Sequence, residues 1–157
     1  MASVLETAGW FRSKASMDHK KIQKLCYYAQ AWSLVLNDRA PLFDGEFEAW
    51  AHGPVNRRLW NKLEEYGYVS VPSDALPLSG SFSDKEQEIL VCVWDTYGDM
   101  TGFQLEDLTH DEEPWRITRG DTPYYAPSTA IISQDSMHNY YKSQYSGDGI
   151  GERARTA

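Results

Sequence analysis

The residues best suited to chemistry form one acidic stretch with a histidine inside it. Its members are Asp107, His110, Asp111, Glu112 and Glu113. Imidazole and carboxylate groups bind metal ions and act as general acids and bases, and His52 or Cys26 could complete a metal site with them. The local spacing matches no known metal-binding pattern, and single histidines and acidic runs are commonly structural or solvent-exposed. We therefore expect no metal and no other cofactor, and a metal-assisted hydrolase that uses His52 and His110 is retained as an alternative.

No other stretch carries the mark of a catalytic site. The sequence lacks GxGxxG, GxxxxGK[ST], GxSxG and HExxH, the patterns that accompany phosphate binding, serine hydrolysis and zinc-dependent proteolysis. Cys26 follows Leu25 within an apolar helical face, which favours a buried thiol over a nucleophile. We expect no catalytic residue and no enzymatic activity.

Two short segments combine aromatic rings with histidine and proline. The segment 48–55 reads EAWAHGPV and contains Trp50 and His52, and the segment 109–115 reads THDEEPW and contains His110 and Trp115. Such residues either stabilise turns or form a binding surface.

Arg57 and Arg58 form a small basic spot close to the first segment. A basic pair on a helix either faces solvent or binds phosphate or carboxylate groups. Both interpretations stay open at this point.

The elements that must position these residues are mostly helical. Apolar residues recur at three- and four-residue steps from Ile22 to Leu36, which predicts a helix that Asp18 caps and that ends near Asn37 and Asp38. Alternation over 46–52 predicts a short strand. Pro54 is expected in the first turn of a second helix that carries Val55, Leu59 and Leu63 and ends at Gly67.

The second half of the chain shows further helix signals. Ser83 with Glu86, and Thr101 with Gln104, form capping boxes ahead of apolar stripes, the second of which contains Phe103, Leu105 and Leu108. Pro114 can begin a helical turn and Ser133 can cap a last helix, while Val69 and Val71 are expected in a brief strand. The pattern predicts a mainly α protein, a compact single-domain helical bundle with a short β-strand or hairpin between the first helices.

Composition excludes several classes of protein. Of 157 residues, 24% are charged, and the formal net charge is −8, which argues against a protein that binds nucleic acid mainly through phosphates. The two cysteines favour a cytoplasmic location over a disulfide scaffold. No apolar run is long enough for a membrane span and the N-terminus does not resemble a secretory signal.

Three motifs together resemble the Panacea domain, formerly called DUF4065, a family that includes phage-associated proteins of the GepA and SocA type. The first, KLxKLxYYA, is matched at Lys21, Lys24, Leu25, Tyr27, Tyr28 and Ala29. The second, AWxxGPV, is matched at Ala49, Trp50, Gly53, Pro54 and Val55. The third, LTHxExPW, is matched at Leu108, Thr109, His110, Glu112, Pro114 and Trp115. The sequence departs from the family pattern at Ala31, where Gly is frequent, and at Asn56-Arg57, where Val-Pro is common.

The resemblance implies the Panacea domain over residues 16–145, preceded by an N-terminal segment over 1–15. The near absence of large apolar side chains after Tyr145 predicts a flexible tail over 146–157. The resemblance also implies an antitoxin that binds and neutralises a cognate toxin protein encoded by an adjacent gene. At least one relative instead delivers its toxin to a bacterial protease, so a proteolytic adaptor is an alternative. The high aromatic content suits a protein-binding domain.

The family resemblance also suggests where a toxin would bind. We expect the surface to include Trp50, His52, Arg57, Arg58, His110 and Trp115. Direct binding to nucleic acid is not expected, because no operator-binding part is visible and the chain is acidic.

Overall fold

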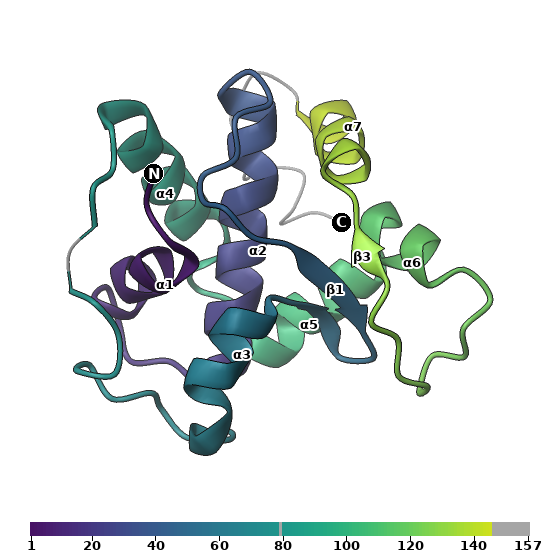
Figure 1. Ribbon diagram of the computed structural model, residues 1–157, viewed down its shortest axis with the longest axis horizontal. Helices are drawn as coiled ribbons and strands as arrows, with labels where there is room; N and C mark the ends of the chain where they lie inside the picture. The colour runs from purple at the N-terminus through teal and green to yellow at the C-terminus, as the bar shows by residue number, and fades with distance from the viewer. Residues whose placement is uncertain (79, 146–157) are drawn as a thin grey trace.

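The architecture is a set of helices packed around one long central helix, α2 (Figure 1). The computed structural model describes residues 1–78 and 80–145. Its helices are α1 (Val4–Arg12), α2 (His19–Leu36), α3 (Arg57–Leu63), the single 3-10 turn η1 (Glu64–Tyr66), α4 (Asp84–Tyr97), α5 (Gly102–His110), α6 (Glu113–Arg119) and α7 (Gln134–Gln144). Its strands are β1 (Phe47–Trp50), β2 (Gly53–Val55) and β3 (Ile131–Ile132). The predicted mainly α fold with a small β element is confirmed.

Helix α2 forms the centre of the core because its apolar residues fill more than one face. Leu25, Cys26 and Ala29 are fully buried and Trp32 nearly so, and α1, α4, α5 and α7 all pack against this helix. The side chain of Asp18 accepts a hydrogen bond from the Lys21 amide and caps the first turn, as predicted. Helix α2 ends at Leu36, with Asn37 as its C-cap, close to the predicted end.

The small sheet places the segment 48–55 against α2. Strand β1 pairs antiparallel with β2 on one side and with β3 on the other. The expectation that Pro54 opens a helix is wrong, because Pro54 and Val55 lie in β2 and α3 begins at Arg57, with Asn56 as its cap. Pro54 is tolerated because β2 is an edge strand, where a missing backbone N–H costs little.

Two further parts of the chain differ from expectation. Val69 and Val71 form no strand, and Ser70 between them makes only an isolated bridge with Asp18. Residues 4–12 form α1, which the sequence analysis did not anticipate. This helix buries Val4 and Phe11 in the core, so its apolar face is explained by packing against α2.

The remaining helices begin where local capping signals predict them. Ser83 and Thr101 each form a complete capping box, Ser133 caps α7, and Pro114 lies in the first turn of α6. These contacts satisfy backbone N–H groups that the first helical turn leaves without partners.

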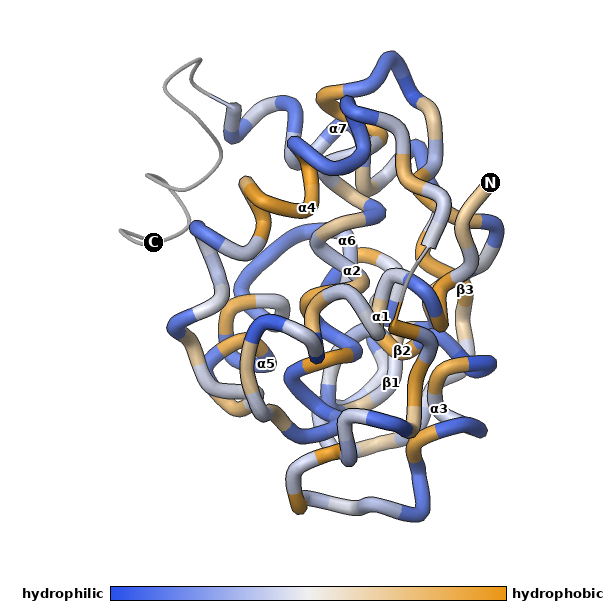
Figure 2. The backbone as a smooth tube through the Cα atoms, turned by 90° about the vertical axis from the view of Figure 1, so that its left-hand side faces the viewer, coloured by the Kyte–Doolittle hydropathy of each residue, from blue (hydrophilic) through white to orange (hydrophobic). Residues whose placement is uncertain are grey.

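Hydrophobic residues alternate with hydrophilic ones along the helices (Figure 2). Within residues 1–78 and 80–145, no helix combines the length and apolarity needed to cross a membrane. The predicted flexible tail over 146–157 lies outside the described residues.

Candidate functional site

The hairpin formed by β1 and β2 places the first predicted site residues directly on α2. Trp50 pairs with Gly53 across the turn, and Gly53 has a φ of +103°. A Cβ atom at this position would lie 2.7 Å from Cε of Lys24 and 3.1 Å from Oγ1 of Thr109. Glycine is therefore needed at position 53 for both its backbone conformation and the close approach of α2 and α5.

Trp50 and Arg57 are in direct contact at the edge of the hairpin. The guanidinium of Arg57 lies 5.2 Å from the centroid of the Trp50 ring and donates to both carboxylate oxygens of Glu48, at 2.8 and 3.1 Å. The hydrogen bond from Arg57 lowers the pKa of Glu48. The Trp50 ring also contacts Trp60, with centroids 4.9 Å apart, so the two tryptophans and Arg57 form one cluster.

His52 lies in the turn of the hairpin and its side chain is 72% exposed. Its Nδ1 atom is 3.4 Å from Oε2 of Glu106, and the other oxygen of that carboxylate accepts from Lys20. Burial would raise the pKa of Glu106, but the hydrogen bond and charge of Lys20 outweigh burial and lower it. The ionised carboxylate of Glu106 therefore links His52 in the hairpin to Lys20 on α2.

His110 and Trp115 lie beneath the hairpin and support it. Trp115 is 5% and His110 8% exposed, and their rings stack with centroids 4.0 Å apart. Nε1 of Trp115 donates to the carbonyl oxygen of Trp50 at 2.8 Å, and Nδ1 of His110 lies 2.7 Å from the hydroxyl of Tyr124. Burial lowers the pKa of His110. These two residues hold the end of β1 in place.

The predicted residues therefore divide into two sets. Trp50, His52, Arg57 and Arg58 reach the surface around the hairpin, where Arg57 and Arg58 open α3 and are exposed. The other two, His110 and Trp115, are buried below them.

Sequence reasoning missed a pocket beside this surface, of about 320 Å³. It lies where α2, the hairpin and α3 meet, and it is lined by His19, Lys20, Gln23, Lys24, Trp50, His52, Val55, Trp60, Glu64, Gly67 and Tyr68. The only sequence signal for it is Lys24, a charged residue at a position of α2 that faces the core. Pockets of this kind, apolar with a few polar groups, are typical binding sites.

Lys24 is a buried amine in that pocket lining. Only 2% of the residue is exposed, and its Nζ atom donates to the carbonyl oxygen of Pro54 at 3.2 Å. Burial lowers the pKa of Lys24 to about 7, and the charge of Lys20 lowers it as well, against the opposing effect of Glu106.

An exposed aromatic pair extends the surface beyond the pocket. Tyr68 and Phe103 stack with centroids 6.0 Å apart, and they are 68% and 59% exposed. The Lys20 ammonium lies 4.2 Å from the centroid of the Phe103 ring. We call the surface formed by Lys20, Trp50, His52, Arg57, Trp60, Tyr68 and Phe103 the aromatic face.

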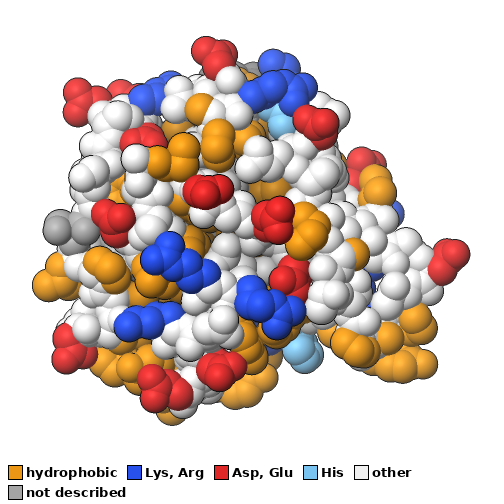
Figure 3. All heavy atoms as spheres, in the orientation of Figure 1, with side chains coloured by type: hydrophobic (Ala, Val, Ile, Leu, Met, Phe, Trp, Pro, Cys, Tyr) orange, Lys and Arg blue, Asp and Glu red, His pale blue; other side chains and the backbone are white. Residues whose placement is uncertain are grey.

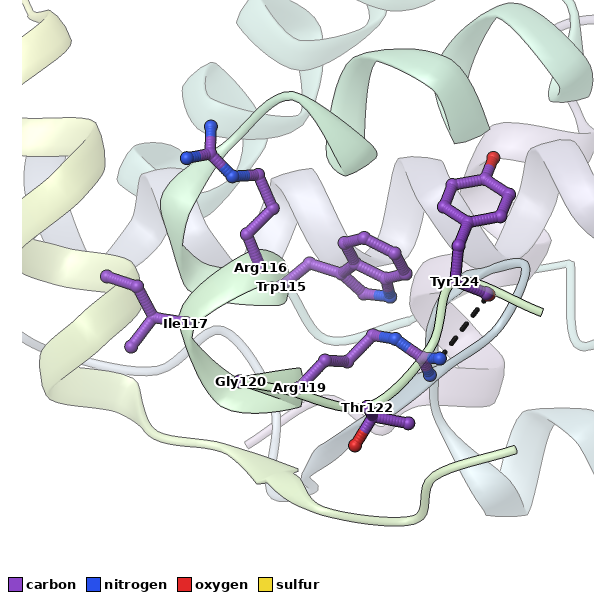
Figure 4. Close-up of a pocket in the computed structure, with 7 residues that line it drawn as sticks. All are labelled: Trp115, Arg116, Ile117, Arg119, Gly120, Thr122 and Tyr124. Atoms are coloured by element: carbon purple, nitrogen blue, oxygen red, sulfur yellow. Dashed lines mark hydrogen bonds between the residues drawn. The ribbon is translucent and has the colours of Figure 1, made fainter. Parts of the chain in front are cut away.

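A second hollow, of about 360 Å³, lies beside α6 (Figure 4). Arg119 extends along Trp115 toward the loop that follows α6, whereas Arg116 and Ile117 point away (Figure 4). The guanidinium of Arg119 donates to the carbonyl oxygens of Ala49 and Ala126, at 2.8 and 2.6 Å. Backbone acceptors on β1 and in the loop thus engage both terminal nitrogens of this arginine, so its role is to fix the loop.

The loop between α6 and β3 is also exposed and apolar. Tyr124 and Tyr125 are 60% and 84% exposed, and hydrophobic side chains gather over this loop at the lower right of the space-filling view (Figure 3). Elsewhere on this face acidic and basic side chains are mixed (Figure 3).

The acidic stretch around His110 does not come together as a metal site. In the described part of the chain, no group of three or more His, Cys, Asp and Glu side chains is placed to hold a metal ion. Glu112 instead lies in the core, where it accepts hydrogen bonds from Tyr28 and Tyr141. The described geometry gives the hydrolase alternative no support. Cys26 is buried, and burial raises the pKa of its thiol.

Comparison with curated proteins and with solved structures gives no match. A family model described as "Antitoxin SocA-like, Panacea domain" matches residues 22–116. The matched region includes all six predicted site residues and every residue of the pocket lining except His19 and Lys20.

Proposed function

Because the chain belongs to the SocA-like antitoxin family, whose members carry the Panacea domain, we propose that it is an antitoxin that binds a cognate toxin protein directly. The toxin is encoded by an adjacent gene, and the complex forms in the cytoplasm. Binding holds the toxin inactive, and no catalytic step by this chain is required.

The observation that carries this proposal is the aromatic face. Tryptophan, tyrosine and arginine supply most of the binding energy at protein interfaces, because they bury large areas and also form polar contacts. Here Arg57 packs on Trp50, and Tyr68 and Phe103 are exposed side by side. Soluble proteins rarely expose clustered aromatic rings without a binding role.

His110 and Trp115 act in this proposal by positioning the face. Their stack and the hydrogen bond from Trp115 to the Trp50 carbonyl fix the hairpin. A preorganised surface loses less conformational entropy on binding than a mobile one. Substitutions of these two residues would weaken binding through the hairpin.

The overall charge supports a basic toxin. A net charge of −8 attracts a basic partner over a distance and speeds the encounter, while individual contacts at the interface set the lifetime of the complex. The mixed charges of the aromatic face then select the orientation.

Charge reversal tests whether the aromatic face is the interface. The double variant Arg57→Glu, Arg58→Glu is expected to bind the toxin at least about tenfold more weakly, because Arg57 would lose its contacts with Trp50 and Glu48. Binding is measured by calorimetry with the purified product of the adjacent gene. Lys142→Glu on α7 changes the same kind of charge elsewhere and serves as the control.

Unchanged affinity in the double variant, with an unchanged melting temperature, would remove this surface from the interface. The toxin half-life in cells then separates steric neutralisation from delivery to a protease. If the antitoxin only blocks the toxin sterically, the half-life of the toxin should not change. A shorter toxin half-life that depends on a protease would indicate the adaptor function.

A further inference from the structure

The pocket beside the aromatic face contains an amine with unused hydrogen-bonding capacity. The Lys24 ammonium has three donors, and within the part of the chain that the structure describes it donates only to the Pro54 carbonyl. Only 2% of the residue is exposed, so further acceptors can reach the amine only from the pocket that it lines. Buried polar groups in proteins are nearly always hydrogen-bonded, so the pocket is suited to a ligand that brings an acceptor to Lys24.

The polar neighbours of Lys24 are already engaged with each other. Gln23 exchanges two hydrogen bonds with the backbone of Asn56. Glu106 accepts from Lys20 and contacts His52. An incoming acceptor would therefore meet Lys24 without displacing an established contact.

The walls of the pocket favour an apolar group. Trp50, Trp60 and Tyr68 contribute aromatic rings and Val55 an aliphatic side chain. The volume of about 320 Å³ is at the lower end for ligand sites, which limits the occupant to about one large residue.

We propose that this pocket binds the C-terminal residue of the toxin, with the α-carboxylate on Lys24 and an apolar side chain against Trp50 and Trp60. An acidic side chain would bring the carboxylate without an apolar body, and an internal apolar residue would bring no carboxylate. A chain end carries both on one residue. The claim that the bound residue comes from the toxin rests on the proposed function. The preference of the pocket for a carboxylate attached to an apolar group does not.

The electrostatic surroundings give this interaction a defined pH dependence. Lys24 has a pKa of about 7, so a carboxylate gains its charged partner below that pH and loses it above. The charged and titratable groups that surround Lys24 are Asp18, His19 and Lys20 on α2, Glu106 and His110 on α5, His52 in the hairpin and Glu64 at the pocket edge. His19 has a pKa of about 4, so it stays neutral over the range tested.

The first test uses two small probes on the wild-type protein. N-acetyl-L-phenylalanine carries the carboxylate and the apolar side chain, and N-acetyl-L-phenylalaninamide lacks only the charge. Titration followed by the indole N–H signals of Trp50 and Trp60 in NMR spectra is expected to give a Kd on the order of 1 mM for the acid and at least about tenfold weaker binding of the amide. Equal affinities would overturn the proposal.

The second test removes the amine and varies the pH. Lys24→Met is expected to abolish the preference for the acid, whereas Lys62→Met, an exposed lysine on α3, keeps it. Acid binding to the wild-type protein should weaken several-fold between pH 6 and pH 8.5, because the amine of Lys24 loses its charge over this range. A preference for the acid that survives Lys24→Met, or acid binding that does not change with pH, would contradict the role of Lys24. If Lys24→Met does not fold, the probe comparison on the wild-type protein decides.

The third test addresses the source of the carboxylate. Extending the toxin by Gly-Ser-Gly at its C-terminus is expected to weaken the complex at least about tenfold, because a longer chain end no longer places its last apolar residue in the pocket. Unchanged affinity would rule out the toxin C-terminus. If the acid probe binds but no toxin does, the proposed function fails and the carboxylate site stands. If the toxin binds but the two probes bind with equal affinity, the proposed function stands and the carboxylate site is ruled out.

Discussion

Lys24 and Gly53 together define the site at the scale of single residues. The amine of Lys24 reaches the carbonyl of Pro54, and the absence of a side chain at Gly53 allows α2 and the hairpin to approach this closely. Gly53 has no equivalent substitute, because its φ is +103° and a Cβ at this position would overlap Cε of Lys24.

Gly53→Ala is expected to destabilise the protein more than Gly67→Ala. Both glycines have positive φ, +103° and +54°, so alanine is strained at either position, at a cost of about 1–3 kcal/mol. A Cβ at Gly67 meets nothing within 4 Å, whereas at Gly53 it overlaps Lys24. Urea denaturation should show Gly53→Ala to be at least about 1 kcal/mol less stable than Gly67→Ala. Equal losses would mean that the hairpin does not pack this closely on α2.

Glu112 is expected to make stability depend on pH. Burial raises its pKa to about 7, against the lowering effect of hydrogen bonds from Tyr28 and Tyr141. Since the folded protein then holds this proton more tightly than the unfolded chain, the stabilisation is present below about pH 4.5 and is lost as pH rises toward 7.

Glu112→Gln tests that contribution, because the amide is neutral at every pH. Relative to the variant, the wild-type protein should lose up to about 3 kcal/mol of unfolding free energy between pH 4.5 and pH 7.5. Denaturant titrations of both proteins at several pH values measure this difference. The titration of His19 and Lys24 affects both proteins equally, so it cancels when the two unfolding free energies are subtracted. Parallel curves for the two proteins would show that Glu112 ionises normally.

At the scale of elements, Arg119 connects α6 to the sheet. Its guanidinium donates to the carbonyl of Ala49 on β1 and to that of Ala126 in the following loop, and it lies 4.9 Å from the centroid of the Trp115 ring. One buried side chain therefore orients a helix, a strand and a loop.

Arg119→Ala is expected to destabilise the protein by about 3 kcal/mol, because it leaves the buried Ala49 carbonyl without this donor and removes the hydrogen bond to the part-buried Ala126 carbonyl. Amide hydrogen exchange should accelerate in residues 123–132 and in β1. Arg116→Ala on the same helix removes an exposed arginine and should change stability by about 0.5 kcal/mol or less. Unaltered exchange in Arg119→Ala would refute the connecting role.

Elements with local signals could be predicted from the sequence, and elements decided by tertiary contacts could not. The caps at Asp18, Ser83 and Thr101 form between residues three positions apart, so their pattern is visible in the chain. Pro54 suits a helix start or an edge strand equally well, and only its pairing with Ala49 decides. Helix α1 also begins at a local signal, the capping box that Ser3 forms with Glu6, which the prediction from sequence overlooked.

The candidate site was predicted only in part for the same reason. Trp50, His52 and Arg57 are close in sequence and were found together. Tyr68 and Phe103 come from separate segments and meet only in the fold. Phe103 is two residues from Leu105 on α5, so the two cannot both face the core, and the structure buries Leu105 and exposes Phe103.

At the scale of the whole molecule, helices packed around α2 support the hairpin and the clustered rings of the aromatic face. Under the proposed function, the net charge of −8 favours approach to a basic toxin, and the aromatic face makes the contact. Screening by salt should therefore slow association several-fold between low and physiological ionic strength, with little change in dissociation. Stopped-flow measurements would contradict this division of roles if only dissociation responded to salt.

Expression of the adjacent gene with and without this protein tests the central claim most directly. The proposed function predicts growth arrest by the adjacent product alone, relief when both proteins are produced, and recovery of the two as a complex. The Arg57→Glu, Arg58→Glu variant should restore the arrest while remaining folded. Arrest that persists in the presence of the folded wild-type protein would contradict the antitoxin function.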